Sequence, residues 1–255
     1  MARTTHHQDS DAEREEPRPA PARLRDGHAP TGAASKPEVA DERPVHPFEE
    51  TGWQEGFFLR RRLEKARIPK RFANKTLESF NVKGIGGIQR KMLVNTAKAY
   101  ISKFTFKAEY PQGLLMRGQV GCGKSHLAVA ILREVILKGH TGLYYNSPDL
   151  LRDIRATFDE RSEVTEDDLI EEVTTTDLLV FDDVGAEKLS DFVLDRFYLI
   201  INERYEGCKP VIITTNLELD PLENRLGKRI VSRIFEMCNP FGPFPEEDWR
   251  RREMR

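Results

Sequence analysis

The stretch Gly118-Gln119-Val120-Gly121-Cys122-Gly123-Lys124-Ser125 decides the fold that we expect for this chain. It matches the pattern G-x-x-x-x-G-K-[ST], in which glycines let the backbone wrap around a phosphate group without clashes from Cβ atoms. Consecutive backbone N–H groups then form an anion-binding nest, and the following helix adds the positive charge of its N-terminal end. We expect Lys124 to reach the β- and γ-phosphates of ATP and the Ser125 hydroxyl to ligate Mg²⁺. The predicted ATP-binding segment runs from Gly118 to His126.

The residues on both sides of this segment favour a phosphate loop over a glycine-rich turn with a chance lysine. Residues 113–117 have the pattern of a short apolar strand, and residues 123–138 have that of an apolar helix that ends before Gly139. A strand, a glycine loop and a helix in this order are the context that the motif requires. Cys122 inside the loop has two interpretations, a small filler or a redox-sensitive thiol, and the filler is favoured.

Strand and helix patterns continue to alternate after this helix. Strands are predicted at residues 141–145, 178–181 and 211–215, helices at 147–158 and 190–206, and a loop with a short helix in the acidic stretch 163–172. Ser147 and Ser190 are expected to cap the two longer helices. The alternation predicts an α/β fold with a parallel sheet covered by helices on both faces, where ligands bind at the carboxyl ends of the strands.

Polar residues follow two of the predicted strands at the point where each strand ends. Asp182 closes an apolar strand in the Walker B arrangement, and we expect it to hold the Mg²⁺ shell. Asp183 is then placed to orient or deprotonate the attacking water, and Asn216 to contact the γ-phosphate or hold that water. Turn-forming aspartates and asparagines are the alternative explanation, which the presence of the phosphate loop disfavours.

Arginines near the C-terminus are candidates for the cation that P-loop ATPases place at the γ-phosphate in the transition state. Arg229 and Arg233 are four residues apart, on one face of a predicted helix, and Arg250 follows Trp249. The alternative is that these are ordinary surface arginines, with Arg233 paired to a nearby carboxylate such as Glu236.

The N-terminal part of the chain is predicted to differ from the rest. Residues 1–47 contain no Phe, Trp or Tyr, so they have too little apolar surface to offset the entropy of ordering and are expected to be disordered. Residues 48–75 are predicted as a helical extension and residues 76–255 as the ATPase domain. The basic helix at 57–67 is interpreted either as a solvated helix packed along one edge or as a surface that docks a partner or nucleic acid.

Composition limits the classes of partner and compartment. The formal net charge of −2 gives no global sign of a nucleic-acid partner, so such a contact must come from local patches. Three widely spaced cysteines make neither a metal-ligand pattern nor a disulfide framework, and a reduced, cytoplasmic location is expected. The N-terminus lacks the apolar run of a signal peptide, and no run of about 18 apolar residues predicts a membrane span.

Together these residues resemble the AAA+ ATPases of the bacterial DnaC/DnaI helicase-loader group, which also contains the transposition helper IstB. The phosphate loop alone marks only a superfamily, and its combination with the later motifs is far more specific. The similarity covers about residues 68–252 and includes Ile68-Pro69-Lys70-Arg71-Phe72, GQVGCGKSHLAVAIL from Gly118, LLVFDDVGAEK from Leu178, Thr214-Thr215-Asn216 and RIVSRIFEMC from Arg229.

The resemblance implies a P-loop NTPase fold with an AAA+ core, a five-stranded parallel sheet flanked by helices. It implies that Asn216 is a sensor on the strand between the two Walker strands. Arg233 resembles an arginine finger that reaches ATP on a neighbouring subunit, and Arg250 resembles a second sensor that contacts ATP in cis. Most AAA+ proteins have Asp-Glu where this chain has Asp182-Asp183. The shorter second carboxylate makes slow, switch-like hydrolysis an expectation.

The resemblance also implies partners. Loaders of this group bind the replicative helicase through an N-terminal extension and touch single-stranded DNA from a ring or spiral, so a homo-oligomer on ATP or DNA binding is expected. The N-terminal region lacks the cysteine-rich zinc module of some loaders, which leaves the partner open. The main hypothesis is an ATPase that loads a helicase during DNA replication, and an IstB-type helper of a transposase is a close alternative. A P-loop small-molecule kinase and a catalytically silent ATP-binding adaptor are further alternatives from other classes.

Overall fold

A computed structural model of the 255-residue chain describes residues 48–84, 86–105, 112–159, 161–186 and 190–249. All of these belong to one compact unit that begins at His46. The predicted disordered segment 1–47 and the second-sensor candidate Arg250 lie outside the described residues. The domain boundary near residue 75 stays a prediction.

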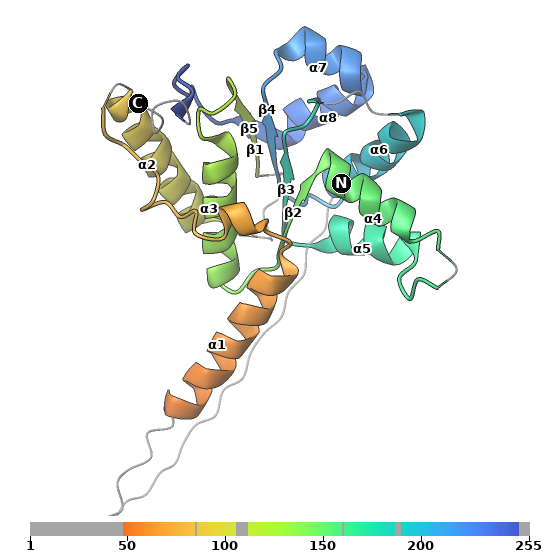
Figure 1. Ribbon diagram of the computed structural model, residues 1–255, viewed down its shortest axis with the longest axis horizontal. Helices are drawn as coiled ribbons and strands as arrows, with labels where there is room; N and C mark the ends of the chain where they lie inside the picture. Colours follow the sequence, from red (N-terminus) through yellow and green to blue (C-terminus); the bar gives the residue numbers. More distant parts are fainter. Residues whose placement is uncertain (1–47, 85, 106–111, 160, 187–189, 250–255) are drawn as a thin grey trace, which may run out of the picture. The chain divides into compact units, whose positions relative to one another are not determined.

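A five-stranded parallel sheet forms the centre of this unit, as predicted (Figure 1). Its strand order is β2-β3-β4-β1-β5, so β4 lies between the strand before the phosphate loop and the strand that ends in Asp182. The strands are β1 (Gly113–Arg117), β2 (Gly142–Asn146), β3 (Leu178–Asp182), β4 (Val211–Thr215) and β5 (Cys238–Pro240). Each neighbouring pair is parallel, with Tyr145 opposite Phe181 and Leu115 opposite Ile213.

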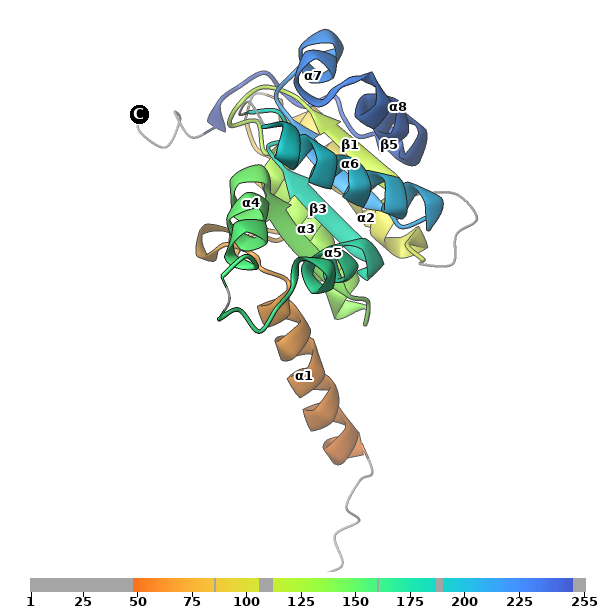
Figure 2. The ribbon, with the colours of Figure 1, turned by 90° about the vertical axis from the view of Figure 1, so that its right-hand side faces the viewer.

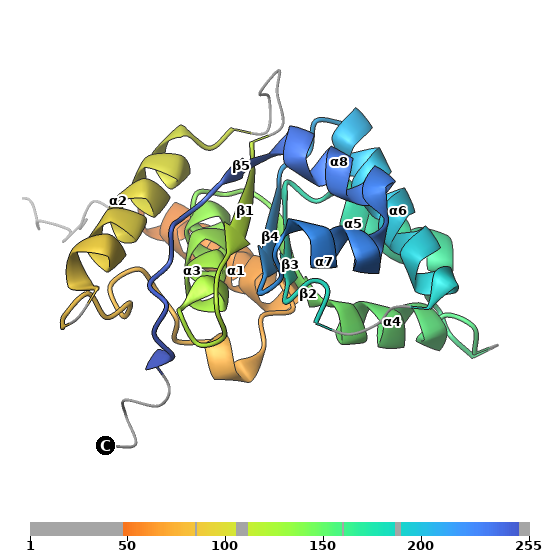
Figure 3. The ribbon, with the colours of Figure 1, turned by 90° about the horizontal axis from the view of Figure 1, so that it is seen from above.

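Helices cover both faces of the sheet, and the two faces carry separate hydrophobic clusters (Figures 1 and 3). One face packs on α2 (Gly87–Lys103) and α3 (Lys124–Leu137), with α1 (Phe48–Lys65) against α3. The other face packs on α4 (Ser147–Ala156), α5 (Glu166–Thr175), α6 (Asp191–Glu206), α7 (Leu219–Leu226) and α8 (Lys228–Met237), which Figure 2 shows from their own side.

The sequence of β3 shows why both faces are covered. All five of its residues are buried. Val180 packs into the cluster around α3, whereas Leu179 and Phe181 pack into the cluster on the opposite face. Successive side chains of a strand point to opposite faces, so a continuous apolar run requires an apolar partner on each side.

Some predicted boundaries differ from the structure. The prediction that Ser147 caps the fourth helix is wrong, because Asn146 is the capping residue and its side chain accepts a hydrogen bond of 2.8 Å from the Asp149 N–H. Ser190 is at the capping position of α6 but its hydroxyl makes no capping bond. The sequence did not predict α2, and β5 was expected only from the resemblance.

Candidate functional site

The phosphate loop lies between β1 and α3, where the sequence predicted it. Gly121 and Gly123 have φ angles of 79° and 109°, in a region that side chains with a Cβ atom rarely adopt. A Cβ atom on Gly121 would lie 1.9 Å from the Asp248 carboxylate, and one on Gly123 would lie 2.7 Å from the Phe80 ring. Both glycines are therefore required by the backbone conformation and by the segments that close over the loop.

Lys124 is folded into the curve of the loop. Its side chain is buried, and its Nζ donates hydrogen bonds of 2.8 Å and 2.9 Å to the carbonyls of Gly118 and Gln119. These carbonyls hold the ammonium group at the N-terminus of α3, beside the backbone N–H groups that the motif provides for an anion. Cys122 is buried behind the loop, and burial raises the pKa of its thiol. A buried, protonated thiol favours the filler interpretation over a redox switch.

His126 connects the start of α3 to the segment that precedes α2. Its Nε2 lies 2.8 Å from the Thr76 carbonyl and 3.1 Å from Ser79 Oγ, and its ring packs edge-on against Phe80 with centroids 5.1 Å apart. Burial lowers the pKa of His126, so the ring is stabilised in its neutral form. The imidazole thus has partners within the protein while it also lines the cleft described next.

A cleft of about 520 Å³ opens beside the loop, a size that suits a small-molecule ligand. Part of its lining comes from the predicted site: Val120, Gly121, Gly123, Lys124, Ser125, His126, Asp182 and Asp183. Gly118, Gln119 and Cys122 belong to the loop but do not line the cleft. The other residues that line the P-loop cleft are Arg71, Phe72, Lys75, Ser79, Phe80, Asn81, Arg90, Asn146, Ser147, Pro148, Ala186 and Trp249.

Asp182 is held by two hydroxyl groups from neighbouring strands. The Tyr144 hydroxyl of β2 donates to its Oδ2 at 2.6 Å, and the Thr214 hydroxyl of β4 donates to its Oδ1 at 2.6 Å. The Thr214 Oγ1 also accepts a hydrogen bond of 2.8 Å from the Asp183 N–H. Thr214 therefore connects both aspartates, and Asp183 leaves the strand with a φ of 57° and an exposed side chain at the cleft.

The donors around the cleft fit a magnesium ion. The predicted ligands, the Ser125 hydroxyl and the Asp182 carboxylate, line the same cleft, and oxygen donors are what Mg²⁺ prefers. Among the described residues no group of three or more His, Cys, Asp or Glu side chains is placed to hold a metal ion. The protein would thus supply few ligands, which is the usual arrangement where substrate phosphates and water complete the shell.

Two other predicted site residues lie away from this lining. Asn216 directly follows β4, which lies between the two Walker strands as the resemblance implied. Its side chain is exposed and does not belong to the described cleft lining. Arg233 lies on α8 in a separate surface depression with Tyr205, Arg229 and Glu236.

The Arg233 guanidinium is stacked on aromatic rings. Its Cζ is 4.9 Å from the ring centroid of Tyr198 and 5.8 Å from that of Tyr205, and its buried Nε has no hydrogen-bond acceptor in the part of the chain that is described. The suggested ion pair with Glu236 is not formed within those residues. Glu236 instead accepts a hydrogen bond of 2.6 Å from the Tyr205 hydroxyl.

Sequence reasoning missed Arg71, which lines the cleft, and the two residues that hold Asp182 beside it. Tyr144 reads as an ordinary strand residue, and Thr214 was noted only as part of the Thr-Thr-Asn motif. Arg71 was quoted only within the Ile68–Phe72 motif ahead of the domain. Arg71 and Thr214 both belong to motifs that carry the family resemblance, and this could have marked them as candidate site residues. The directions of their side chains depend on the tertiary structure.

Comparisons with known proteins agree with this geometry. Residues 49–235 match the family described as IstB-like ATP binding protein. The replicative helicase loader DnaC of Buchnera aphidicola (subsp. Schizaphis graminum) is 29% identical over 176 residues, which is 69% of each chain. DnaC of Escherichia coli K12 is 25% identical over the same length and share. A crystal structure of the DnaC helicase loader superposes with a TM-score of 0.60 and 31% identity, covering 68% of this chain and 98% of that one.

The described residues contain no helix long and apolar enough to cross a lipid bilayer. The matched segment includes the phosphate loop, the strand that ends in Asp182 and the helix that carries Arg233. With its strand order, its P-loop cleft and this match over most of its length, the chain belongs to the IstB-like ATP-binding family and has an AAA+ core.

Proposed function

We propose that this protein is an ATP-dependent loader that places a replicative helicase on single-stranded DNA. The observation that carries the proposal is the P-loop cleft, where Lys124, Ser125 and Asp182 meet in a chain that resembles DnaC loaders over 69% of its length. The small-molecule kinase alternative has no comparable support, because the chain belongs to the IstB-like family.

In this proposal the phosphates of ATP lie along the loop from Gly118 to Ser125. Lys124 exchanges its two carbonyl partners for phosphate oxygens, and the N-terminus of α3 adds favourable electrostatics. Ser125 and Asp182 are the residues that would hold Mg²⁺, which neutralises charge that develops on the β- and γ-phosphates. The two hydroxyl groups on Asp182 keep its carboxylate in one orientation for this task.

Hydrolysis is assigned to residues around the same cleft. The exposed Asp183 carboxylate is placed to orient or deprotonate water, and its backbone is held by Thr214. Arg233 of a neighbouring copy supplies the cation at the γ-phosphate, and Asn216 assists from the end of β4. Because Asp183 is shorter than the glutamate common at this position, slow hydrolysis with a switch-like role follows.

An IstB-type helper of a transposase is the second candidate, and the match of residues 49–235 to the IstB-like family favours it. Both functions use the same ATP chemistry and differ in the protein partner. Capture of the host's replicative helicase by the full-length chain, in ATP and not in ADP, supports the loader. Capture of a transposase in its place would overturn the loader and support the helper.

The ATP-binding part is tested by calorimetry on the full-length chain and a Lys124→Ala variant. The parent is expected to bind ATP and to turn it over slowly, at a rate that single-stranded DNA changes. The variant is expected to lose binding and to retain its melting temperature, because in the described residues the ammonium group of the lysine bonds only to atoms of the loop itself. Equal ATP affinity in parent and variant would refute the assignment of the loop as the phosphate-binding site. ATP binding by the parent without any hydrolysis would support a catalytically silent adaptor.

A further inference from the structure

The linker between α1 and the sheet lies along the edge strand β2. The Ala66 carbonyl accepts a hydrogen bond of 2.9 Å from the Tyr144 N–H, so this segment is held at backbone level to the strand. A turn of 3₁₀-helix at Lys70–Phe72 follows. The buried ring of Phe72 packs edge-on against the Tyr144 ring with centroids 6.0 Å apart. Two side chains of this linker, Arg71 and Phe72, therefore line the P-loop cleft.

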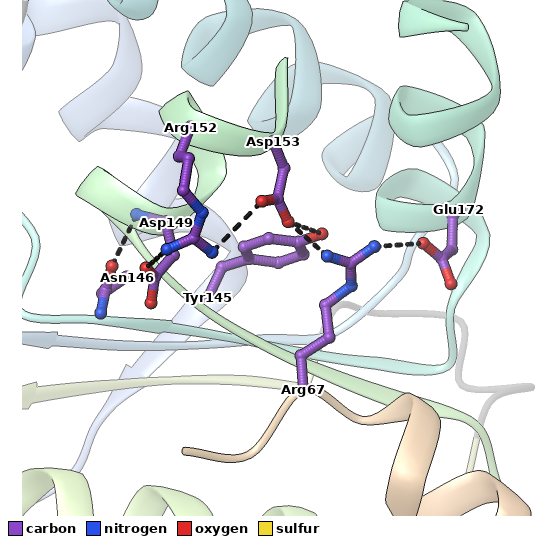
Figure 4. Close-up of polar contacts among 7 residues, drawn as sticks. All are labelled: Arg67, Tyr145, Asn146, Asp149, Arg152, Asp153 and Glu172. Carbon is purple, nitrogen blue, oxygen red and sulfur yellow. Dashed lines mark hydrogen bonds and ion pairs between the residues drawn. The ribbon is translucent and has the colours of Figure 1, made fainter. Parts of the chain in front are cut away.

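Arg67 anchors the linker on the other face of the sheet (Figure 4). Its guanidinium bridges Asp153 of α4 and Glu172 of α5, the second at 3.4 Å, and stacks 5.0 Å from the Tyr145 ring centroid. Arg67 itself has a φ of 57°, an unfavourable value that these contacts offset. With Ala66 and Phe72 also fixed, the backbone around Arg71 is held from both faces of β2.

Arg71 presents its charged group to the P-loop cleft. It lines the cleft with Lys124, Ser125 and Asp182, and its Cζ lies 4.6 Å from the Phe72 ring centroid. No carboxylate among the described residues lies within ion-pair distance of it. An exposed guanidinium stacked on a buried ring is preoriented for an anion and gives up no ion pair to bind one.

The position of Arg71 within the cleft is given by Tyr144. The Tyr144 hydroxyl bonds to Asp182, and the Tyr144 ring packs against the Phe72 ring on which the Arg71 guanidinium stacks. Arg71 therefore lies at the Asp182 end of the cleft. In P-loop ATPases the corresponding aspartate serves the Mg²⁺ that bridges the β- and γ-phosphates, so this is the end where the terminal phosphate lies.

We propose that Arg71 contacts the terminal phosphate of the bound nucleoside triphosphate in cis and thereby makes the cleft distinguish ATP from ADP. This inference rests on the proposed function, because it requires nucleotide in the P-loop cleft. The planar guanidinium forms paired hydrogen bonds with phosphate oxygens, which a lysine at the same position cannot reproduce. Arg71 also lies six residues after the end of α1, so the presence of the terminal phosphate is sensed on the segment that joins the N-terminal extension to the core.

The test is calorimetric titration of the full-length chain with the non-hydrolysable analogue AMPPCP and with ADP, both with Mg²⁺. Arg71→Ala is expected to weaken AMPPCP binding by about tenfold or more and to change ADP binding by less than about twofold. Lys70→Ala is the matched control, because it removes the same charge from the same turn and is absent from the described lining of the cleft. It is expected to leave both affinities unchanged.

The outcomes separate this inference from the proposed function. An equal loss for AMPPCP and ADP in Arg71→Ala, or no loss, would overturn the terminal-phosphate contact even if Lys124→Ala abolishes binding as expected. Failure of the parent to bind either nucleotide would instead refute the proposed function. Arg71→Lys keeps the charge and guards against misfolding of the alanine variant. It is expected to recover part of the AMPPCP affinity, because its charge still attracts the terminal phosphate. Arg71→Lys that distinguishes AMPPCP from ADP as well as the parent does would overturn the paired contact of the guanidinium.

Discussion

The Tyr144 hydroxyl donates a hydrogen bond of 2.6 Å to Oδ2 of Asp182, across the register of two neighbouring strands. Thr214 occupies the other carboxylate oxygen from the opposite side, also at 2.6 Å. The carboxylate is buried, so its orientation is set by these two hydroxyl groups and not by solvent. Each strand next to β3 thus contributes one group that positions the proposed magnesium ligand.

Removal of either hydroxyl should weaken magnesium-dependent nucleotide binding. Tyr144→Phe and Thr214→Val are each expected to raise the Mg²⁺ concentration for half-maximal ATP binding by about tenfold, as for other groups that orient metal ligands. Thr214→Val also leaves the Asp183 N–H without its acceptor, so it should cost about 1–3 kcal/mol of unfolding free energy. Tyr145→Phe is the control, because its hydroxyl contacts Asp153 on the other face of the sheet. Equal Mg²⁺ dependence in all four proteins would contradict the positioning role.

The two aspartates should separate binding from hydrolysis. Asp182→Asn is expected to weaken Mg²⁺-dependent ATP binding, because the buried position loses the charge that the ion requires. Asp183→Asn is expected to bind ATP normally and to hydrolyse it about 10²- to 10⁴-fold more slowly, because its exposed carboxylate is the group proposed to act on water. Calorimetry and phosphate release measure the two effects. The Walker B assignment fails if both variants turn ATP over at the parent rate.

Activity should depend on assembly through Arg233. Arg233 lies on α8, outside the P-loop cleft of its own chain, and is proposed to serve ATP on a neighbour, so turnover per chain is expected to rise with protein concentration. Arg233→Ala should lose most hydrolysis and keep near-normal ATP affinity. Arginine fingers contribute on the order of 10³–10⁵ in rate when fully engaged, and a slow ATPase should lose less. Lys228→Ala, on the same helix and exposed, is the control.

Mixing experiments distinguish this shared site from a structural role. Arg233→Ala mixed with Lys124→Ala should regain part of the activity, because some intact ATP sites then face an intact Arg233. If Arg233 only stabilises the rings of Tyr198 and Tyr205, the variant should lose melting temperature and mixing should restore nothing. Turnover per chain that stays constant with concentration would count against the shared site in the same way.

Stability should fall in mild acid because of His126. Burial lowers the folded-state pKa of this ring below the ordinary value near 6.5, so below that pH the unfolded chain takes up a proton that the folded chain resists. The contribution is therefore fully present above about pH 6.5 and is lost as the pH falls through the folded pKa. His126→Gln, which does not titrate, should show a smaller decrease in unfolding free energy between pH 7 and pH 5. Parallel pH profiles for parent and variant would show that His126 is not the group responsible.

The sequence by itself determined the α/β fold, the phosphate loop and the strand that ends in Asp182. These features are read from contiguous residues, since the loop chemistry needs glycines and lysine at fixed spacing and a doubly covered strand needs an unbroken apolar run. Most loop residues from Val120 to His126, with Cys122 as the exception, and both aspartates line the cleft as named from the sequence. Asn216 follows the end of β4 but does not line the described cleft.

Only the tertiary structure decided which distant side chains complete the site. Arg71, Tyr144 and Thr214 belong to three separate segments, the linker turn, β2 and β4, and the strand order brings the last two to opposite sides of Asp182. Arg204 illustrates the same limit. This charged side chain of α6 is fully buried, donates to the carbonyls of Val173, Thr176 and Pro210, and has its pKa lowered to about 9 by burial. A buried charge is tolerable only where such partners converge, and their convergence is a property of three-dimensional packing that no local stretch of sequence contains.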